Sequence, residues 1–336
     1  MVETTPLTDR YGRVASDLRI SLTDKCNLRC SYCMPAEGLD WLPNERLLSD
    51  DEIVRLAAIA VQRLGVREIR FTGGEPLVRR GLVDIVARTR AVDPSVELSV
   101  TTNGLGLAKL ARPLADAGLS RVNVSLDTVR PETFATITRR DRLHDVVEGL
   151  EAAAEAGLGP IKINAVLLRD VNDDQAAELL EWCVTRGYQL RFIEQMPLDA
   201  QHGWSREGMV TADETFERLE KEFTLTPAHE PRGSAPAELF HVDGGAGVVG
   251  TVGVIASVTR PFCGDCDRVR LTADGQVRNC LFAREESDLR TALRNGASDE
   301  ELASRWVTAM AGKLPGHGID DPTFLQPDRP MSAIGG

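Results

Sequence analysis

The chain has 336 residues, and its 51 Asp and Glu against 39 Lys and Arg give a formal net charge of −12. This acidic balance argues against broad binding to nucleic acids or to anionic membranes, because the chain lacks a general positive field. No apolar run approaches the length of a membrane span, and the N-terminal residues lack the apolar region of a signal peptide. We therefore expect a cytoplasmic globular protein with one large domain or two smaller ones.

The first expected strand, which contains Leu18 and Leu22, leads into a polar loop with three cysteines. Cys26, Cys30 and Cys33 are spaced C-x3-C-x2-C, and the polar residues between them argue against burial in a core strand. Three thiolates cannot complete a structural zinc site, which needs four protein ligands, but they can hold three irons of a [4Fe–4S] cluster. Such a cluster keeps its fourth iron open for another ligand.

Downstream of this loop, helices and strands alternate. Ser49 and Glu52 form a capping box for a helix that Gly65 should end, and a short strand over residues 67–72 follows. Six strands joined by helices imply right-handed crossovers and a parallel sheet, which we expect to curl into a partial (βα)6 barrel of an α/β fold. The remaining four strands are expected at residues 96–103, 120–127, 160–166 and 188–194.

Beyond about residue 197 this alternation stops. Residues 197–208 and 227–247 are rich in Gly, Pro, Ser and His, which is typical of loops. We therefore divide the chain into a barrel over residues 1–200 and a smaller C-terminal region over residues 201–336 that closes the barrel mouth.

Each of the six strands alternates aliphatic and polar side chains. In the first strand Leu18 and Ile20 share one face, whereas Arg19 and Ser21 share the other. Helices must cover the aliphatic face, so we expect the polar face to point into the barrel. The alternative is an open sheet with one solvated face.

Four cations fall on the expected inner face, and in a strand an inward charge is costly without a partner. In an acidic protein, such a group suggests a small polyanionic ligand such as a triphosphate. Pairing with Glu97, Asp127 or Glu194 is the alternative, and we expect at least two cations to stay available. The four are Arg19, Arg70, Lys162 and Arg191.

A second cysteine triad, Cys263, Cys266 and Cys280, lies near the C-terminus and has no fourth ligand close in sequence. The nearest histidines, His241 and His317, are distant along the chain, so a second [4Fe–4S] cluster with an open iron is favoured over zinc. Arg268 and Arg270 add two cations beside this triad. The seventh cysteine, Cys183, lies in an expected helix, where we expect core packing.

These motifs together carry a resemblance. The first triad with Tyr32 before its last cysteine, followed by βα units, resembles the radical S-adenosylmethionine (SAM) superfamily, and Gly73-Gly74-Glu75-Pro76 is similar to that superfamily's motif for the SAM amino group. The wider set is similar to the GTP 3′,8-cyclase family of molybdenum cofactor biosynthesis, the MoaA family. It comprises DLRISLTDKCNLRCSYCMP, RFTGGEP, TTNG, NVSLD, LRFIEQM, FCGDCDRVRL and the terminal Gly335-Gly336.

The resemblance implies two [4Fe–4S] clusters and SAM as cofactors. Each cysteine triad would hold one cluster. The residues implied to contact SAM are Tyr32, Gly74, Ser125 and Met196. Those implied to contact GTP are Arg19, Arg70, Thr101, Lys162, Arg268, Arg270 and the backbone of Val269. The residues implied to act in catalysis are Arg268, Arg270, Gly335 and Gly336.

The family's chemistry is also implied. A 5′-deoxyadenosyl radical would remove the hydrogen at C3′ of GTP, and the new radical would add to guanine C8 to give (8S)-3′,8-cyclo-7,8-dihydroguanosine 5′-triphosphate. A reducing electron donor and a downstream cyclic pyranopterin monophosphate synthase are the implied partners, and a homodimer is allowed. Two alternatives stay open: another two-cluster radical SAM enzyme that modifies a different nucleotide or a peptide, and a zinc-stabilised binding protein without catalysis.

Overall fold

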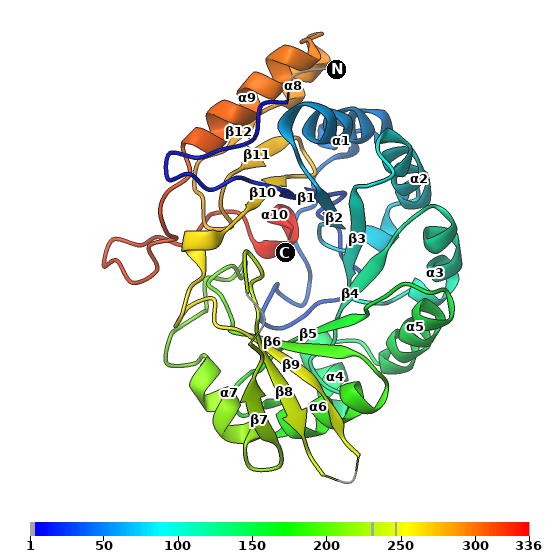
Figure 1. Ribbon diagram of the computed structural model, residues 1–336, viewed down its shortest axis with the longest axis vertical. Coiled ribbons are helices and arrows are strands. Elements are labelled where there is room, and N and C mark those ends of the chain that lie inside the picture. The colour runs from blue at the N-terminus through cyan, green and yellow to red at the C-terminus, as the bar shows by residue number, and fades with distance from the viewer. Residues whose placement is uncertain (1–3, 230–231, 246, 336) are drawn as a thin grey trace.

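The computed structural model describes residues 4–229, 232–245 and 247–335, and the strands in these residues form a single mixed sheet (Figure 1). The order of its twelve strands in the described chain is β12-β11-β10-β1-β2-β3-β4-β5-β6-β9-β8-β7. Their bounds are β1 (Asp17–Ser21), β2 (Glu68–Thr72), β3 (Glu97–Thr102), β4 (Arg121–Ser125), β5 (Lys162–Val166), β6 (Gln189–Ile193), β7 (Thr224–Pro227), β8 (Glu238–Asp243), β9 (Val249–Ile255), β10 (Arg268–Leu271), β11 (Gln276–Arg278) and β12 (Ser287–Asp288).

The central strands of the sheet, from β10 through β1 to β6 and on to β9, are parallel to their neighbours. The sequence predicted β1 to β6 and the helices between them, and the structure confirms this α/β arrangement. The C-terminal region adds one parallel strand on each side, β10 beside β1 and β9 beside β6. Antiparallel strands complete both ends of the sheet.

Helices form most of the connections between the parallel strands. Helix α1 begins at the predicted capping box, because the Glu52 amide donates to Ser49 Oγ at 3.2 Å and the Ser49 amide donates to Glu52 Oε2 at 2.8 Å. The helix bounds are α1 (Asp50–Leu64), α2 (Leu82–Val92), α3 (Leu107–Asp116), α4 (Pro131–Thr138), α5 (Leu143–Glu155), α6 (Ala176–Thr185), α7 (Ala212–Leu219), α8 (Arg290–Arg294), α9 (Asp299–Ala311) and α10 (Met331–Ile334).

The core lies between the helices and the aliphatic face of the sheet. Leu18, Ile20 and Phe71 are fully buried in one cluster with helix residues such as Leu56. Cys183 also belongs to this cluster, so its predicted role in core packing is confirmed. Figure 1 shows helices α1, α2, α3 and α5 along the outer side of the curved sheet, whereas α10 and the C-terminus lie inside the curve.

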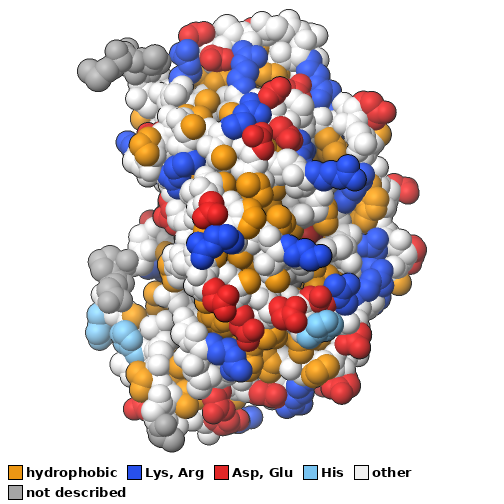
Figure 2. All heavy atoms as spheres, turned by 90° about the vertical axis from the view of Figure 1, so that its right-hand side faces the viewer, with side chains coloured by type: hydrophobic (Ala, Val, Ile, Leu, Met, Phe, Trp, Pro, Cys, Tyr) orange, Lys and Arg blue, Asp and Glu red, His pale blue; other side chains and the backbone are white. Residues whose placement is uncertain are grey.

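Neither the described helices nor the surface in Figure 2 shows a feature typical of a membrane span or of nucleic-acid binding. Among the described residues, no helix combines the length and apolarity needed to cross a membrane. On the face shown in Figure 2, acidic and basic side chains are interspersed and the basic ones do not gather into one field. This face therefore offers no extended basic surface for a nucleic acid.

Candidate active site

The loop after β1 holds the first triad, Cys26, Cys30 and Cys33. The amides of Cys33 and Met34 both donate to the Cys30 carbonyl, at 3.0 and 3.1 Å, and fold the loop tightly. The three thiols are partly buried, and burial raises the pKa of each, that of Cys33 to about 12. Thiolates rather than thiols bind metal, so only a strongly positive centre such as iron would hold these three sulfurs deprotonated.

Gly74 packs the end of β2 against this loop. Its amide donates to the Thr23 carbonyl at 2.8 Å, and the amide of Glu75 donates to the Lys25 carbonyl at 2.8 Å. A Cβ at position 74 would lie 2.3 Å from the Asp24 carbonyl oxygen and 2.4 Å from that of Lys25. Only glycine therefore fits here without moving the cysteine loop.

Tyr32 connects the first triad to the end of β4. Its hydroxyl donates to Asp127 Oδ2 at 3.0 Å, and the Val166 amide donates to Asp127 Oδ1 at 2.9 Å. Burial raises the pKa of Asp127 to about 6. Tyr32, Ser125 and Met196 line one cavity, so the predicted SAM contacts other than Gly74 share it.

A cavity of about 270 Å³ reaches both triads and is lined by the polar face of the sheet. The polar face therefore lines a cavity and is not fully solvated, whereas the predicted partial barrel around it stays a prediction. Cys26, Cys30, Gly74, Lys162 and Val269 do not line the cavity. The predicted site residues in its wall are Arg19, Tyr32, Cys33, Arg70, Thr101, Ser125, Met196, Cys263, Cys266, Arg268, Arg270 and Cys280.

Strand register gathers the arginines of the cavity. Arg19 on β1 lies directly between Arg270 on β10 and Arg70 on β2. Arg268 lies two residues before Arg270 on the same face of β10. Its Nε and Nη2 are buried without a hydrogen-bond partner in the described structure. A buried donor without a partner is costly, so these nitrogens suit a ligand that supplies acceptors. Val269 faces the opposite side of β10 and is fully buried in the core.

Two carboxylates partly neutralise this group. Arg70 Nη2 lies 2.6 Å from Glu68 Oε1, and Arg19 Nη2 lies 3.5 Å from Asp17 Oδ2. Glu68 and Asp17 occupy the same strand face as the arginines they contact, two residues earlier in β2 and β1. These carboxylates reduce the repulsion between the buried positive charges.

The other two predicted cations have no carboxylate partner within 4.0 Å among the described residues. Arg191 donates instead to Asn164 Oδ1 at 2.9 Å, and no ion pair involves Lys162. Burial, together with neighbouring arginines such as Arg121, lowers the pKa of Lys162 to about 8. Arg191 and Lys162 are therefore not neutralised by an acid in the described structure, but Lys162 lies outside the cavity lining, so the availability of two cations for a ligand stays a prediction.

The three acids that the sequence suggested as partners for these cations bind other groups. Glu97 pairs with Arg121, and Asp127 accepts from Tyr32. Glu194 accepts hydrogen bonds from the backbone amides at positions 212, 258 and 259. The alternative in which these three acids absorb the predicted cations is therefore wrong, because they are held by closer donors.

The second triad follows β9 and flanks β10, and a buried lysine contacts it. Lys313 Nζ donates to the carbonyls of Cys266 and Arg268, both at 2.9 Å, and lies 3.4 Å from Cys266 Sγ. Burial raises the pKa of Cys266, but the charges of Arg268 and Lys313 outweigh it and leave that pKa lowered. Lys313 is 2 % exposed and belongs to the surroundings of the triad, which sequence reasoning missed.

His317 also reaches the cavity although it is distant in sequence from the triad. The Ile319 amide donates to His317 Nδ1 at 3.1 Å, so the proton resides on Nε2, which lies 3.1 Å from the Ser257 carbonyl oxygen. Both ring nitrogens are thus engaged. His317 contacts Cys263 through its backbone amide and does not offer its ring as a fourth ligand.

The C-terminal tail enters between the two triads. Ser21 Oγ donates to the Ile334 carbonyl at 2.9 Å, and Arg270 Nε donates to the Gly335 carbonyl at 3.3 Å. The Ser332 amide hydrogen-bonds the sulfur of Cys33. Gly336, the other predicted catalytic glycine, lies outside the described residues.

The cysteine triads suit clusters better than single ions. In the described part of the chain, no three His, Cys, Asp or Glu side chains gather tightly enough to hold one metal ion. A [4Fe–4S] cluster places each thiolate on a different iron, so its ligands stand further apart than those of zinc. Donors aimed at the sulfurs, such as Asn103 Nδ2 at 3.8 Å from Cys26 Sγ, are also typical of clusters.

Comparison with known proteins places this site in a family. The model of the Radical SAM superfamily matches residues 20–183, and that of Molybdenum Cofactor Synthesis C matches residues 188–319. A GTP 3′,8-cyclase of Streptomyces coelicolor is 65 % identical over 331 residues, which cover 98 % of this chain and 96 % of the relative. The chain belongs to the GTP 3′,8-cyclase family of radical SAM enzymes.

Other members of the family are similarly close. A GTP 3′,8-cyclase of Mycobacterium sp. strain KMS is 63 % identical over 336 residues and covers 100 % of this chain and 95 % of the relative. Among solved structures, Streptococcus suis SuiB bound to S-adenosylmethionine superposes with a TM-score of 0.54 at 13 % identity, over 87 % of this chain and 69 % of SuiB. At this identity the likeness concerns the fold alone.

Proposed function

We propose that this enzyme converts GTP to (8S)-3′,8-cyclo-7,8-dihydroguanosine 5′-triphosphate, the first step of molybdenum cofactor biosynthesis. The observation that carries the proposal is one cavity that reaches two cysteine triads and is lined by several arginines. Among the described residues, Nε and Nη2 of one of them, Arg268, are buried without a hydrogen-bond partner. The identity of 65 % to a GTP 3′,8-cyclase over almost the whole chain supports the same substrate.

In this proposal Cys26, Cys30 and Cys33 hold one [4Fe–4S] cluster, and the second triad holds another. When bound, the first cluster and SAM supply a carbon radical that removes one hydrogen atom from the substrate. Tyr32, Gly74, Ser125 and Met196 are the proposed SAM contacts, and they lie beside the first triad or on the adjoining wall. The partial barrel over residues 1–200 and a mouth closed by residues 201–336 belong to the same proposal.

In this proposal, side chains on the polar face of the sheet bind GTP. Arg19, Arg70 and Lys162 would attract the triphosphate, together with Thr101 as a hydrogen-bonding side chain. Arg268 and Arg270 lie between this group and the second triad, where they would hold the substrate with its ribose toward the first triad. Val269 would contribute only its backbone, because its side chain faces the core.

The walls of the cavity also exclude competing reactions. Gly335 covers Arg270 from the side of the tail, where it would help to keep water away from a bound substrate. A cytoplasmic location, a reducing protein as electron donor, a downstream cyclic pyranopterin monophosphate synthase that takes the product, and a homodimer complete the proposal.

The test is an anaerobic incubation of the iron-loaded protein with SAM, a reductant and GTP, followed by mass analysis of the nucleotides. We expect a GTP-derived product of unchanged mass that differs from GTP in its chromatographic retention. ATP serves as the substrate control, and a Cys26→Ala variant serves as the enzyme control. Product from ATP at the same rate, or none from GTP with both clusters loaded, would contradict the proposal.

A further inference from the structure

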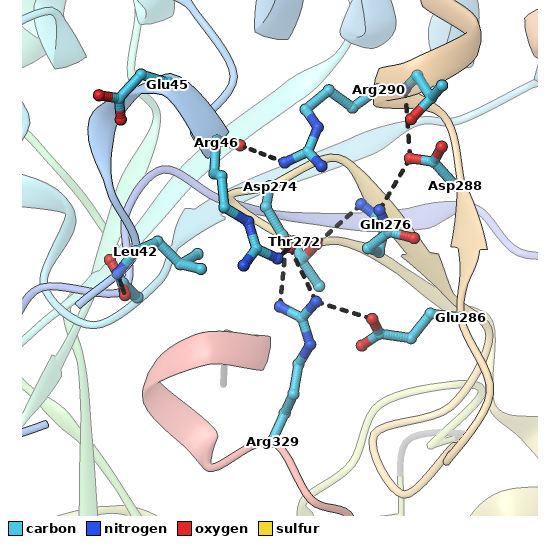
Figure 3. A network of polar contacts seen from close by, with 12 residues as sticks. Leu42, Glu45, Arg46, Thr272, Asp274, Gln276, Glu286, Asp288, Arg290 and Arg329 are labelled. Atoms are coloured by element: carbon cyan, nitrogen blue, oxygen red, sulfur yellow. Dashed lines mark hydrogen bonds and ion pairs between the residues drawn. The ribbon is translucent and has the colours of Figure 1, made fainter. Parts of the chain in front are cut away.

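A network of ion pairs lies outside the cavity, where the tail joins the rest of the molecule (Figure 3). Arg329 Nη1 and Nη2 donate to the two oxygens of Asp274, each at 2.9 Å, in a bidentate pair. Arg329 Nη2 also lies 2.9 Å from Glu286 Oε2. The Asp274 side chain is 1 % exposed, so this pair is shielded from solvent on the acid's side.

The partners of Arg329 belong to the β10–β11 hairpin and to the segment between β11 and β12. Asp274 lies in the turn between β10 and β11 and accepts a further bond from Thr272 Oγ1 at 2.7 Å. Glu286 also pairs with Arg278 of β11, at 2.6 Å. Figure 3 shows Arg329 reaching from the chain before α10 toward both acids.

The same hairpin meets the tip of the tail. Arg278 is in register with Arg270 of β10, and Arg270 Nε donates to the Gly335 carbonyl. The tail is therefore attached to one hairpin at two places, at Arg329 outside the cavity and at Gly335, which contacts the cavity-lining Arg270. Only residues 330–334, which include α10, separate the two attachments, so the first is well placed to position the second.

We propose that Arg329 is a positioning residue, whose ion pairs with Asp274 and Glu286 hold the C-terminal tail on the β10–β11 hairpin so that Gly335 meets Arg270 in the cavity. The importance of the tail for catalysis rests on the proposed function, whereas the anchoring itself does not. Without the anchor, the one-turn helix α10 would rely on the Met331 amide, which donates to the Leu198 carbonyl at 2.9 Å, and on the contacts beyond it. A single helical turn is not stable by itself.

The structure offers a matched control. Arg46 Nη2 lies 3.5 Å from Asp274 Oδ2, so Arg46 contacts the same carboxylate as Arg329. Arg46 lies in the segment before α1 with its side chain 53 % exposed, and among the described residues it makes no ion pair with the tail itself. An Arg46→Gln variant therefore removes a charge from the same network and leaves the anchor in place.

Hydrogen exchange of the cluster-loaded protein, without GTP, tests the anchor. In Arg329→Gln, amides of the C-terminal peptide, Met331 and Gly335 among them, should exchange roughly 10- to 100-fold faster than in the wild type, because hydrogen bonds between charged groups are lost. Arg46→Gln should leave this exchange unchanged. Unchanged exchange in Arg329→Gln, or equal acceleration in both variants, would overturn the proposal.

A second variant guards against simple misfolding, because Arg329→Gln leaves Asp274 buried with less compensation. The double variant Asp274→Asn/Arg329→Gln restores neutrality there, so it should melt closer to the wild type and still show fast exchange of the tail. Turnover gives a separate result. In Arg329→Gln and in the double variant, kcat with GTP should fall by a similar factor, and KM for SAM should not change. If the tail of Arg329→Gln exchanges fast but the wild type does not turn over GTP, the anchor is supported and the proposed function is rejected.

Discussion

Replacement of Gly335 by alanine tests whether the tail must fit closely in the cavity. Gly335 has φ +85°, and a Cβ there would lie 2.4 Å from Ser21 Oγ and 2.7 Å from Thr72 Cγ2. Ser21 cannot turn aside freely, because its hydroxyl donates to the Ile334 carbonyl at 2.9 Å. Gly335→Ala therefore combines backbone strain, a steric clash and the loss of a hydrogen bond.

The magnitude follows from these contributions. A positive φ costs an alanine about 1–2 kcal/mol, and the lost hydrogen bond adds about 1 kcal/mol. A total of about 2–3 kcal/mol corresponds to a loss of activity of roughly 30- to 160-fold, if only molecules with the tail in place react. Because the tail is short, the global melting temperature should hardly change.

Gly296 provides the matched control. Its φ is +83°, but no heavy atom lies within 4 Å of a Cβ built there, and it occupies the exposed turn between α8 and α9. Gly296→Ala should lower the free energy of unfolding by about 1–2 kcal/mol and keep wild-type kcat. The assay is product formation from GTP beside thermal unfolding of each variant. Equal activities of the two variants would refute the close fit of the tail.

Three further predictions concern the cations and the second triad. Because the pKa of Lys162 is lowered to about 8, chiefly by burial, this lysine loses its charge as the pH rises through 8, and KM for GTP should rise between pH 7 and 9. Lys162→Arg should flatten this profile, and superimposable profiles would count against a role in triphosphate binding. Cys280→Ala should lose roughly half of the bound iron but still cleave SAM reductively, since the first triad is intact; full iron content would contradict a second cluster. Lys313→Met should lower the free energy of unfolding by roughly 2–3 kcal/mol, because the carbonyls of Cys266 and Arg268 lose their donor, with Lys313→Arg as the conservative comparison; unchanged unfolding would contradict this.

The arrangement of side chains on the strands could be predicted because alternation is local. Arg19 and Arg70 were assigned to the inner face from neighbours two residues away, and both line the cavity. The same rule would have placed Asp17 and Glu68 beside them, since each precedes its arginine by two residues. The more distant acids Glu97, Asp127 and Glu194 do not pair with Arg19 or Arg70, because strand register brings Asp17 and Glu68 nearer.

The places of β9 and β10 could not be predicted, because neither strand follows its parallel neighbour through a simple helical crossover. Which edge a returning strand pairs with depends on the whole sheet. For the same reason, Lys313 and His317 gave no local signal, although both contact the second triad. A lysine or histidine in a polar segment is usually a solvated side chain, and only tertiary contacts distinguish these two.

The most direct test of the central claim follows one hydrogen atom. The cluster-loaded enzyme is incubated anaerobically with SAM, a reductant and GTP that carries deuterium at C3′, and the mass of the released 5′-deoxyadenosine is measured. We expect transfer of deuterium into 5′-deoxyadenosine, because the proposed position of GTP brings its ribose to the first triad. Cleavage of SAM that depends on GTP but transfers no deuterium would contradict the proposed position of the substrate.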